Sequence, residues 1–474
     1  WNFPAAIPNN GLVSAIAAGS SAILKPAPEA RAVAAALVDQ LHEAGVPQDL
    51  VQLVCTPDNE VGTHLVTHPG VDMVMLTGSI ETAEMFQSWK PSMHLNAETS
   101  GKNAMVITAA ADIDQAIKEL VKSAFGHAGQ KCSAASLAII EGSVYDDPTF
   151  HIRLADAVRS LAVGEATDFN NIVGPVINPP TGNLLRALTT LEPGEAWLVE
   201  PIKINETTFT PGVRKDVKPN SWFHLNECFG PVLGLMRASD LTHAVQLQNA
   251  TQYGLTGGIQ SLDPKEIDFW LANVQVGNAY VNRHITGAIV ERQPFGGWKK
   301  SSIGPGQKPG GPNHLSGYGN WTEQGINIDS AITDYKNQWN NYFTHEHDPT
   351  GLKSEANILR YFPVDKVYVR CSNPTAPEID LMRAASAITG VPLEISVRSD
   401  ESEAALGNRM QHATGESRLR ILAPATDELL SLAHQAGITV DTAPVTGSGR
   451  LELTHWLKEQ AISRTMHRYG RLLN

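Results

Sequence analysis

The sequence predicts an α/β fold with several domains, and three observations support this prediction. The chain has 474 residues, enough for two to four domains, each with its own hydrophobic core. Short continuous apolar runs alternate with amphipathic helical patterns over most of the chain. The alternation returns four times in the last part of the sequence. Strands that alternate with helices are typical of domains built on a parallel sheet.

Residues 1–97 are predicted to form part of a nucleotide-binding domain whose opening strands lie upstream. Three strands are expected, in "SAILK", Leu50–Cys55 and Val71–Leu76. A helix over Pro28–His42 would begin at a proline and end before a glycine. The second and third strands read as continuous apolar runs, as expected for strands covered on both faces. We expect these two to lie in one parallel sheet, joined by a short helix that Asp58 caps.

Residues 98–320 are predicted to form a second α/β domain. Its expected strands are "AMVIT", "SLAIIE", "VLGLM", "LTGGIQS" and "NAYVN", and its expected helices are Asp112–Phe125, Thr149–Leu161, Asp240–Asn249 and Pro264–Gln275. Glycine and proline crowd the segment Pro294–Gly319, which predicts a loop. Residues 321–362 are polar and are predicted to be a linker.

Residues 363–474 repeat the α/β pattern. The expected strands are "KVYVRC", "LEISVRS", "LRILAP" and "ITVDTAP", each followed by a helix. The strand-to-helix turns carry carboxylates, namely Glu378, Asp380, Glu401, Glu403, Asp427 and Glu428. Carboxylates suit a helix N-terminus but repel a phosphate there. We therefore expect a nucleotide-fold-like domain that binds no nucleotide and covers a surface of the preceding part.

Composition excludes some classes of partner. A formal net charge of −13, with no basic patch, argues against nucleic acid and acidic membrane surfaces as partners. The weakly polar run Leu12–Leu24 is too short and too interrupted by serine to span a bilayer. The four cysteines (Cys55, Cys132, Cys228, Cys371) are far apart, which favours free thiols and the cytoplasm. Trp1 opens the chain without a methionine, so we expect the protein to continue upstream.

The stretch "GHAGQKCSAAS" presents Cys132 as either a nucleophile or a buried thiol. Free cysteine is among the most buried residue types, which favours the second interpretation. A glycine three positions earlier would let backbone amides approach a ligand, and Lys131 adds positive potential. The local pattern leaves these two interpretations equally open. The other three cysteines lie in or near apolar runs and are expected to be core thiols.

Other candidate residues are ambiguous when taken singly. Glu98, in "NAETSGKN", is either a general base or a helix cap. Asn2, in "WNFP", is either an oxyanion donor or an ordinary turn residue. "LTGS" follows an apolar strand and could hold a pyrophosphate, although many turns contain the same residues. "NECFGPV" supplies a second carboxylate, Glu227, beside Phe229.

Two further stretches are rich in polar residues or glycine. "QPFGGWKKSSIGPGQKPGGPNHL" is a loop whose backbone amides could bind an anion, whereas Lys299 and Lys300 are expected to be solvated. "HEHD", at His345–Asp348, has the composition of a metal site. It lies in the polar linker with no further ligands to place beside it, so no metal is expected.

Seven motifs, taken in order, resemble the aldehyde dehydrogenase superfamily over about residues 1–320. They are "WNFP", "KPAP", "LTGS", "AETSGKN", "GQKCS", "ECFGPV" and "PFGGWKKS". "GQKCSA", "NRHITGAIVERQPFGG" and "KPGGPNHL" are similar to the L-glutamate γ-semialdehyde (1-pyrroline-5-carboxylate) dehydrogenase branch. The tail resembles the C-terminal extension of long proline utilization A proteins, in which a flavin-dependent proline dehydrogenase domain comes first.

The resemblance implies a fold and a reaction. The fold would be that of aldehyde dehydrogenases, a Rossmann-like nucleotide domain plus an α/β catalytic domain, with an additional C-terminal Rossmann-like domain. L-glutamate γ-semialdehyde would be oxidised to L-glutamate through a thiohemiacetal and a thioester on Cys132. Asn2 and the Cys132 backbone N–H would hold the oxyanion, and Glu98 would activate the hydrolytic water.

The resemblance also implies ligand contacts. NAD would be bound by Lys25 at the adenosine ribose, Gly78 and Ser79 at the pyrophosphate, Glu227 at the nicotinamide ribose and Phe229 beside the nicotinamide. One departure is "KPAP", where Pro28 displaces the acidic residue that favours a free 2′-hydroxyl. NAD is still favoured over NADP.

The substrate's α-carboxylate would be anchored by Ser133 and by the amides of Gly310 and Gly311, with Tyr318 over its aliphatic chain. FAD would be a cofactor only of an upstream proline dehydrogenase domain, which would be the partner within the same polypeptide. Homo-oligomerisation is left open.

Two alternatives remain at this point. One is another NAD(P)-dependent semialdehyde dehydrogenase with a different acid group on its substrate. The other is a non-catalytic scaffold or lid within a larger enzyme, because the opening strands of the nucleotide site are missing from this chain.

Overall fold

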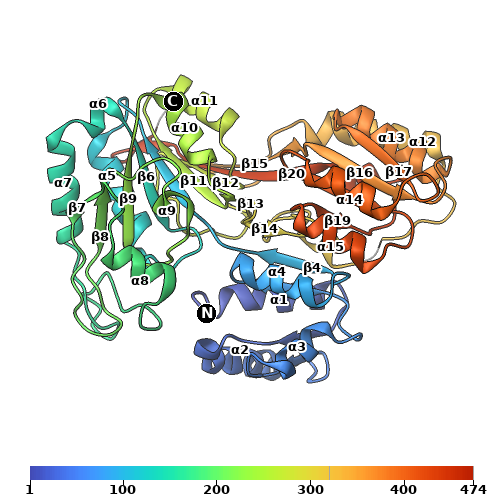
Figure 1. Cartoon of the computed structure of the whole chain (residues 1–474), viewed down its shortest axis with the longest axis horizontal. Helices are drawn as coiled ribbons and strands as arrows, with labels where there is room; N and C mark the ends of the chain where they lie inside the picture. Colours follow the sequence, from blue (N-terminus) through green and yellow to red (C-terminus); the bar gives the residue numbers. More distant parts are fainter. Residues whose placement is uncertain (320, 473–474) are drawn as a thin grey trace. The chain divides into compact units, whose positions relative to one another are not determined.

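The computed structural model describes residues 1–319 and 321–472, and these form two compact units. Unit 1 comprises Trp1–Thr99, Ser302–His347 and Arg360–Glu459. Unit 2 comprises Ser100–Ser301, Asp348–Leu359 and Gln460–Asn474. Figure 1 colours the elements along the chain. Both units contain segments from the middle of the chain and from its tail, so neither is one continuous stretch.

The helices and strands of unit 2 alternate as the sequence predicts. Its strands are β5 (Asn103–Ile107), β6 (Ala135–Glu141), β7 (Ala196–Val199), β8 (Gly212–Lys215), β9 (Val232–Ala238), β10 (Tyr253–Gly254), β11 (Thr256–Gln260), β12 (Asn278–Val281), β13 (Trp298–Lys299), β21 (His467–Arg468) and β22 (Arg471–Leu472). Its helices are α5 (Ile113–Phe125), η2 (Gly126–Gly129), α6 (Gly142–Tyr145), α7 (Pro148–Arg159), α8 (Gly182–Thr189), α9 (Trp222–Leu225), α10 (Leu241–Asn249) and α11 (Pro264–Asn273).

Two long strands begin in one unit and end in the other. They are β15 (Glu355–Pro363) and β20 (Leu457–Thr465). The large sheet has the order β15-β20-β12-β11-β5-β6-β9-β8-β7. From β20 to β8 all neighbours are parallel. The β7–β8 pair at one edge is antiparallel. At the other edge β15 runs antiparallel to β20, because the Val364 N–H donates to the Trp456 carbonyl and the Met466 N–H donates to the Ser354 carbonyl. The α/β class predicted from the sequence is confirmed.

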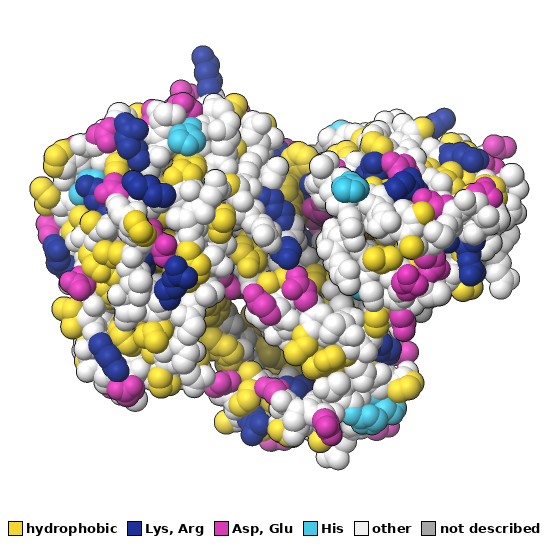
Figure 2. Space-filling model, in the orientation of Figure 1, with side chains coloured by type: hydrophobic (Ala, Val, Ile, Leu, Met, Phe, Trp, Pro, Cys, Tyr) yellow, Lys and Arg dark blue, Asp and Glu magenta, His cyan; other side chains and the backbone are white. Residues whose placement is uncertain are grey.

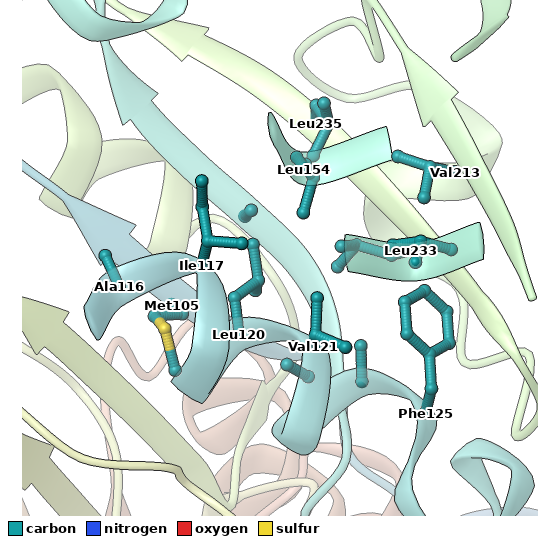
Figure 3. Packing of buried hydrophobic residues seen from close by; sticks show 14 of the residues in the cluster. Met105, Ala116, Ile117, Leu120, Val121, Phe125, Leu154, Val213, Leu233 and Leu235 are labelled. Carbon is teal, nitrogen blue, oxygen red and sulfur yellow. The ribbon is translucent and has the colours of Figure 1, made fainter. Parts of the chain in front are cut away.

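Helices cover both faces of this sheet. Successive strand residues point to opposite sides, so each strand contributes side chains to the core on both faces. Met105 and Ile107 of β5 pack in the cluster that contains α5 and α7, whereas Ala104 and Val106 pack in the cluster with α10 and α11. Figure 3 shows the first cluster, in which α5 side chains such as Leu120 lie among residues of the sheet. Every residue of β5 is buried, as its unbroken apolar run predicts.

Unit 1 combines the first part of the chain with most of the tail. Its strands are β1 (Ala22–Leu24), β2 (Val51–Leu53), β3 (Val74–Thr77), β4 (Leu95–Glu98), β14 (Ser302–Ile303), β16 (Lys366–Cys371), β17 (Leu393–Val397), β18 (Ser417–Ile421) and β19 (Thr439–Asp441). Its helices are α1 (Ala6–Ala17), η1 (Pro28–Ala30), α2 (Arg31–Glu43), α3 (Glu60–Thr67), α4 (Ile80–Trp89), η3 (His314–Tyr318), α12 (Ile328–Gln338), η4 (Trp339–Phe343), α13 (Pro377–Thr389), α14 (Glu403–Gln411), α15 (Asp427–Gln435), α16 (Gly449–Glu452) and η5 (Leu453–Trp456). The predicted linker 321–362 thus includes α12 and η4.

Three expectations for the first hundred residues are wrong. Among the described residues β2 pairs with β1 and β3 pairs with β4, so β2 and β3 do not share a sheet. Strands β2 and β3 are not covered on both faces, because Gln52 in β2 is exposed and the residues of β3 alternate between half-buried and exposed. Asn59, not Asp58, caps α3: its side chain accepts from the Val61 amide, while Asp58 pairs with Lys25.

The tail sheet in unit 1 has the order β17-β16-β18-β19, and all of its strands are parallel. Five of the six predicted carboxylates lie in the first turns of α13, α14 and α15, whereas Glu401 precedes the N-cap of α14 and pairs with Arg409. Helix α15 also contacts the first part of the chain through His434. Its Nδ1 lies 3.1 Å from Gln87 Nε2 on α4, and its Nε2 lies 2.9 Å from the Pro91 carbonyl oxygen.

The visible surface agrees with the charge argument made from composition. In Figure 2 the Lys and Arg side chains are scattered among Asp and Glu, and they form no basic patch on the face shown. No helix in the described residues combines the length and the apolar character that a bilayer span requires.

Candidate active site

Cys132 lies in a turn of unit 2 that the neighbouring backbone and one amide side chain hold in place. The turn is closed by the Ala134 N–H, which donates to the Lys131 carbonyl over 3.0 Å. Asn103, at the start of β5, donates its side-chain amide to the carbonyl oxygens of Cys132 (2.7 Å) and Ala134 (3.0 Å). The Cys132 side chain is half-buried, whereas Cys228 and Cys371 are buried. Cys55 is exposed, so the expectation that it is a core thiol is wrong. This turn therefore has a fixed backbone and a thiol that solvent reaches.

The segment after β4 packs directly against this turn. A Cβ atom at Gly101 would lie 2.7 Å from the Cys132 carbonyl oxygen, so only glycine fits there. The Gly101 N–H donates to Glu227 Oε1 over 2.8 Å. Unit 2 thus brings two of the predicted site regions together, around Cys132 and around Glu227.

Lys102 is a buried cation in the same segment. Its Nζ donates to the Ser136 hydroxyl over 2.6 Å and lies 3.9 Å from the centroid of the Phe223 ring. Burial lowers the pKa of Lys102 to about 8, although the nearby Cys228 and Glu227 act in the opposite direction. Glu227 is therefore in a partly positive environment.

Ser133 and Phe229 adjoin the same turn. Ser133 is buried, and its hydroxyl accepts a long hydrogen bond of 3.5 Å from the Gly287 N–H. Phe229 adopts a left-handed backbone conformation (φ 54°), and its carbonyl accepts from the Gln130 side chain over 3.3 Å. Gln130 Oε1 in turn accepts from the Ile177 N–H. Gln130 therefore fixes the Phe229 segment beside the Cys132 turn.

The other predicted site residues lie in unit 1, and two of the regions meet at β4. Glu98 is the last residue of β4, the central strand of the sheet β14-β4-β3. It is in register with Thr77 on one side and Ser302 on the other. The Gly78 N–H donates to the Glu98 carbonyl over 3.1 Å, and the Ser79 side chain caps α4 by accepting from the Thr82 N–H. Glu98 and the "LTGS" turn are thus neighbours.

Lys25 and Asn2 lie elsewhere in unit 1. Lys25 directly follows β1, and its Nζ donates to Asp58 Oδ1 over 2.9 Å at the surface. Asn2 directly precedes the bend and turn that open α1, and its side chain is half-buried. Lys25 thus lies just beyond the strand in which the sequence predicts it, and Asn2 lies just before the turn.

The predicted substrate-anchor glycines lie in a tight turn. Gly310 has a left-handed backbone (φ 77°), and the Gly311 N–H donates to the Lys308 carbonyl over 2.9 Å. Tyr318, in η3, lies edge-on to His314, with its hydroxyl 3.3 Å from His314 Nε2. Burial raises the pKa of Tyr318. The glycine turn and Tyr318 are therefore two ends of one ordered segment.

The comparisons with known proteins place this set of motifs in a family. The family model described as "Aldehyde dehydrogenase family" matches residues 1–322. The chain belongs to the aldehyde dehydrogenase family.

Two named relatives of the chain are bacterial. It is 35% identical over 326 residues to the 1-pyrroline-5-carboxylate dehydrogenases of Geobacillus sp. (strain WCH70) and Bacillus subtilis (strain 168), which covers 66% of this chain. The match covers 62% of the length of each relative, so the chain spans less than two thirds of these proteins.

Solved structures extend the comparison to the tail. Proline utilization A from Corynebacterium freiburgense is 44% identical, with a TM-score of 0.92, and matches all of this chain and 50% of its own. A 1-pyrroline-5-carboxylate dehydrogenase from Thermus with bound NAD is 33% identical, with a TM-score of 0.62, over 67% of this chain and 63% of its own. The predicted aldehyde dehydrogenase fold is confirmed.

Sequence reasoning missed Asn103 as a residue that shapes the site around Cys132. All of its side-chain polar atoms are used, because Oδ1 accepts from the Thr256 N–H over 3.0 Å in addition to the two bonds that Nδ2 donates. Asn103 ends the quoted motif "NAETSGKN", so a signal was present. Its partners come from distant parts of the chain, which no local pattern reveals.

Side chains of the stretch "HEHD" make local contacts within unit 1 and the adjoining segment. His347 stacks on Tyr342 with ring centroids 4.1 Å apart, and Asp348 accepts from backbone amides that include Thr350 and Asn357. In the part of the chain that the structure describes, no group of three or more His, Cys, Asp or Glu side chains is placed to hold a metal ion.

Proposed function

We propose that this chain oxidises L-glutamate γ-semialdehyde to L-glutamate with NAD, the second step of proline catabolism. The proposal is supported by relatives that carry the name 1-pyrroline-5-carboxylate dehydrogenase. The match of the whole chain to half of a proline utilization A structure supports a bifunctional polypeptide. In that polypeptide an upstream proline dehydrogenase domain with FAD would supply the aldehyde.

One observation carries the catalytic assignment, namely the fixed turn that presents a half-buried thiol at Cys132. We propose that the thiol first loses its proton to solvent, and that the resulting thiolate sulfur adds to the aldehyde carbon and converts the carbonyl oxygen into an oxyanion. The Cys132 N–H and the Asn2 amide would donate to this oxyanion, and one such donor contributes about 3 kcal/mol to the transition state. NAD, when bound, would accept the hydride that leaves the same carbon, which then forms a thioester with Cys132.

Glu98 would complete the reaction as a general base. It would take a proton from a water molecule whose oxygen attacks the thioester carbon, and the carbon–sulfur bond would then break. The products are the carboxylic acid, the Cys132 thiolate and a protonated Glu98, and the enzyme returns to its starting state when Glu98 releases this proton to solvent and NADH leaves. The position of Glu98 at the end of a central strand favours this role, because the strand fixes its backbone.

The donor set of the chain fits NAD. The "LTGS" turn leads into α4, a ten-residue helix whose first turn presents backbone amides to an anion. We propose that Ser79 and Gly78 line the pyrophosphate and that Lys25 contacts the adenosine ribose. Glu227 would bind the nicotinamide ribose and Phe229 would pack beside the nicotinamide. NAD is preferred to NADP because Glu29, in the first turn of η1, keeps a carboxylate near the end of β1.

The substrate's carboxylate would be held by neutral donors. Ser133, Gly310 and Gly311 offer a hydroxyl and backbone amides, and such a set binds an anion without burying an unpaired cation. Tyr318 would cover the aliphatic chain. We also propose that the ranges 1–97, 98–320 and 363–474 act as nucleotide-binding, catalytic and accessory domains in the cytoplasm.

The decisive experiment measures NADH production from L-glutamate γ-semialdehyde by the full polypeptide, with and without Cys132→Ala. We expect the substitution to lower kcat by more than about a thousandfold, because a covalent nucleophile is lost. Cys55→Ala is the matched control: this thiol is exposed, and we expect its loss to change kcat by less than about twofold. Activity that survives Cys132→Ala would contradict the proposal.

Two further measurements separate the alternatives. A higher kcat/KM for succinic or aliphatic semialdehydes than for L-glutamate γ-semialdehyde would favour another semialdehyde dehydrogenase. Calorimetric titration of the chain with NAD tests the scaffold alternative, which predicts no binding.

A further inference from the structure

The segment Lys308–Asn313 is the loop that carries the two proposed anchor glycines, and it is held in an unusual way. Its first residue, Lys308, is only 1% exposed, and its last residue, Asn313, is 4% exposed. Between them the chain turns sharply at Gly310 and comes out at a half-buried Gly311. The two ends of the loop are therefore buried while the glycines between them are within reach of solvent.

A single carboxylate from the tail holds both ends of this loop. Glu459 Oε2 accepts from the backbone N–H of Lys308 over 2.9 Å. Glu459 Oε1 accepts from the side-chain amide of Asn313 over 2.6 Å. The same amide donates to the Tyr361 hydroxyl over 3.0 Å. Each oxygen of Glu459 is thus committed to one end of the loop.

The environment of this carboxylate is closed to water. Glu459 is 5% exposed, and burial raises its pKa while the two loop donors lower it. Burial lowers the pKa of the Lys308 side chain to about 8, against the opposing charges of Glu98 and Glu459. Lys308 therefore links the loop electrostatically to the proposed general base, and Glu459 holds the backbone of that lysine.

Glu459 lies 146 residues after the last residue of this loop, Asn313, and outside the residues 1–322 that the family model matches. The tail is therefore more than a cover for this part of unit 1. It supplies a carboxylate that accepts from the donors at both ends of the loop.

We propose that Glu459 is a positioning residue that sets the conformation of the Lys308–Asn313 loop and thereby the affinity of the enzyme for the substrate's α-carboxylate. The inference rests on the proposed function, in which Gly310 and Gly311 bind that carboxylate. A glutamine at position 459 would turn its NH2 group toward one of the two loop donors. Two donors would then face each other, and that end of the loop would be released.

The test compares two aldehydes in the full polypeptide, L-glutamate γ-semialdehyde and butanal, which has no carboxylate. For Glu459→Gln we expect KM for the semialdehyde to rise about tenfold with kcat within about threefold, the effect of losing one hydrogen bond to a charged group. The KM for butanal should stay unchanged. Asn313→Ala removes only the side-chain donor of the same contact and should give the same pattern. Glu428→Gln, an exposed carboxylate of the tail, should leave both KM values at wild type.

The outcomes are separable. A wild-type enzyme that does not oxidise the semialdehyde overturns the proposed function. A wild-type enzyme that does, together with variants whose KM values for the two aldehydes change equally or not at all, overturns the role of Glu459 alone. The same conclusion follows if both variants lose their folded state, because Glu459 would then be a purely structural residue.

Discussion

Three consecutive residues in left-handed conformation lead from α5 into the turn of Cys132. They are His127 (φ 59°), Ala128 (φ 53°) and Gly129 (φ 66°). This conformation costs about 1–2 kcal/mol for a residue with a side chain, so two such residues in succession need compensation. Ala128 and Gln130 provide it, because the first is buried in the core and the second makes hydrogen bonds to two other segments. The position of the Cys132 thiol thus depends on the strained backbone of residues 127–129.

Within residues 127–129, the backbone conformation depends most on Gly129. A Cβ atom there would lie 2.6 Å from the carbonyl carbon of Gly230, and the backbone at position 129 is left-handed. For Gly129→Ala we expect the free energy of unfolding to fall by at least about 2 kcal/mol, from strain and overlap together. We also expect NADH production to fall, because the Cys132 turn must shift.

Gly126→Ala is the matched control for this prediction. Gly126 follows α5 with φ −56°, and a Cβ atom there would meet nothing within 4 Å. We expect its effect on stability to be below about 1 kcal/mol, with activity retained. Chemical denaturation and steady-state assays of both variants check the pair, and equal effects at the two positions would refute the argument.

At the scale of elements, the sequence predicts the helices and strands that local patterns mark. It does not predict which strands pair when they lie far apart in the chain. Helices α5, α10 and α11 begin after the aspartates 112, 240 and 263, whose side chains accept hydrogen bonds from the first turn of each helix. Such caps and apolar runs are visible in the sequence. The sheet that each short strand of unit 1 joins is set by distant neighbours, so the expected pairing of β2 with β3 is wrong.

The same contrast holds for the site. Cys132, Glu98 and the "LTGS" turn stand out because motifs mark them, and the structure places them at strand ends and turns. Asn103 and Glu459 could not be singled out from the sequence, because their roles depend on the hydrogen-bond partners of their side chains. Those partners lie between 29 and 153 residues away. Sequence reasoning therefore identifies the chemical groups better than the contacts that hold them.

His224 links two elements of unit 2, α9 and α10, and makes the stability of this part depend on pH. Its Nδ1 accepts from the Asn220 N–H over 2.9 Å, so its Nε2 carries the proton and donates to the Leu247 carbonyl over 3.0 Å. Burial lowers the pKa of His224 below the ordinary value of about 6.5. Below that ordinary value the unfolded chain binds a proton that the folded chain does not bind. The free energy of unfolding therefore falls as pH drops through this range.

We expect His224→Gln to reduce this pH dependence by up to about 1.4 kcal/mol per pH unit, the contribution of one proton. Urea denaturation of wild type and variant between pH 7.5 and pH 5 measures the two slopes. His412→Gln is the control, because His412 lies on the surface and its loss should leave the slope unchanged. An identical slope for His224→Gln and wild type would show that His224 does not remain neutral in the folded protein.

At the scale of the whole molecule, the tail contributes a strand to the large sheet. Residues 461–464 of β20 pair in parallel with Asn278–Val281 of β12. Gln460 donates its side-chain amide to the Val276 carbonyl, and Ile462 is buried in the core cluster of α10 and α11. Strand β20 therefore joins the sheet beside β12, although about 180 residues separate the two strands in the sequence. Pairing of two strands this far apart in sequence is a slow step of folding, because distant residues must meet before any contact stabilises them.

Removal of the tail should expose β12 as an edge strand. A chain that ends before Pro363 lacks β20, so the backbone N–H and carbonyl groups of β12 that now bond to it would face solvent beside an apolar core. We expect this truncation to aggregate and to lose activity, as size-exclusion chromatography with light scattering and an NADH assay would show.

A chain that ends after Met466 keeps β20 and loses only the hairpin β21–β22, whose Arg468 and Tyr469 bond to Asp112 at the surface. Exposed contacts of this kind contribute little, so the shorter deletion should stay monodisperse and active. A soluble and fully active chain that lacks everything from Pro363 onward would refute the role assigned to β20.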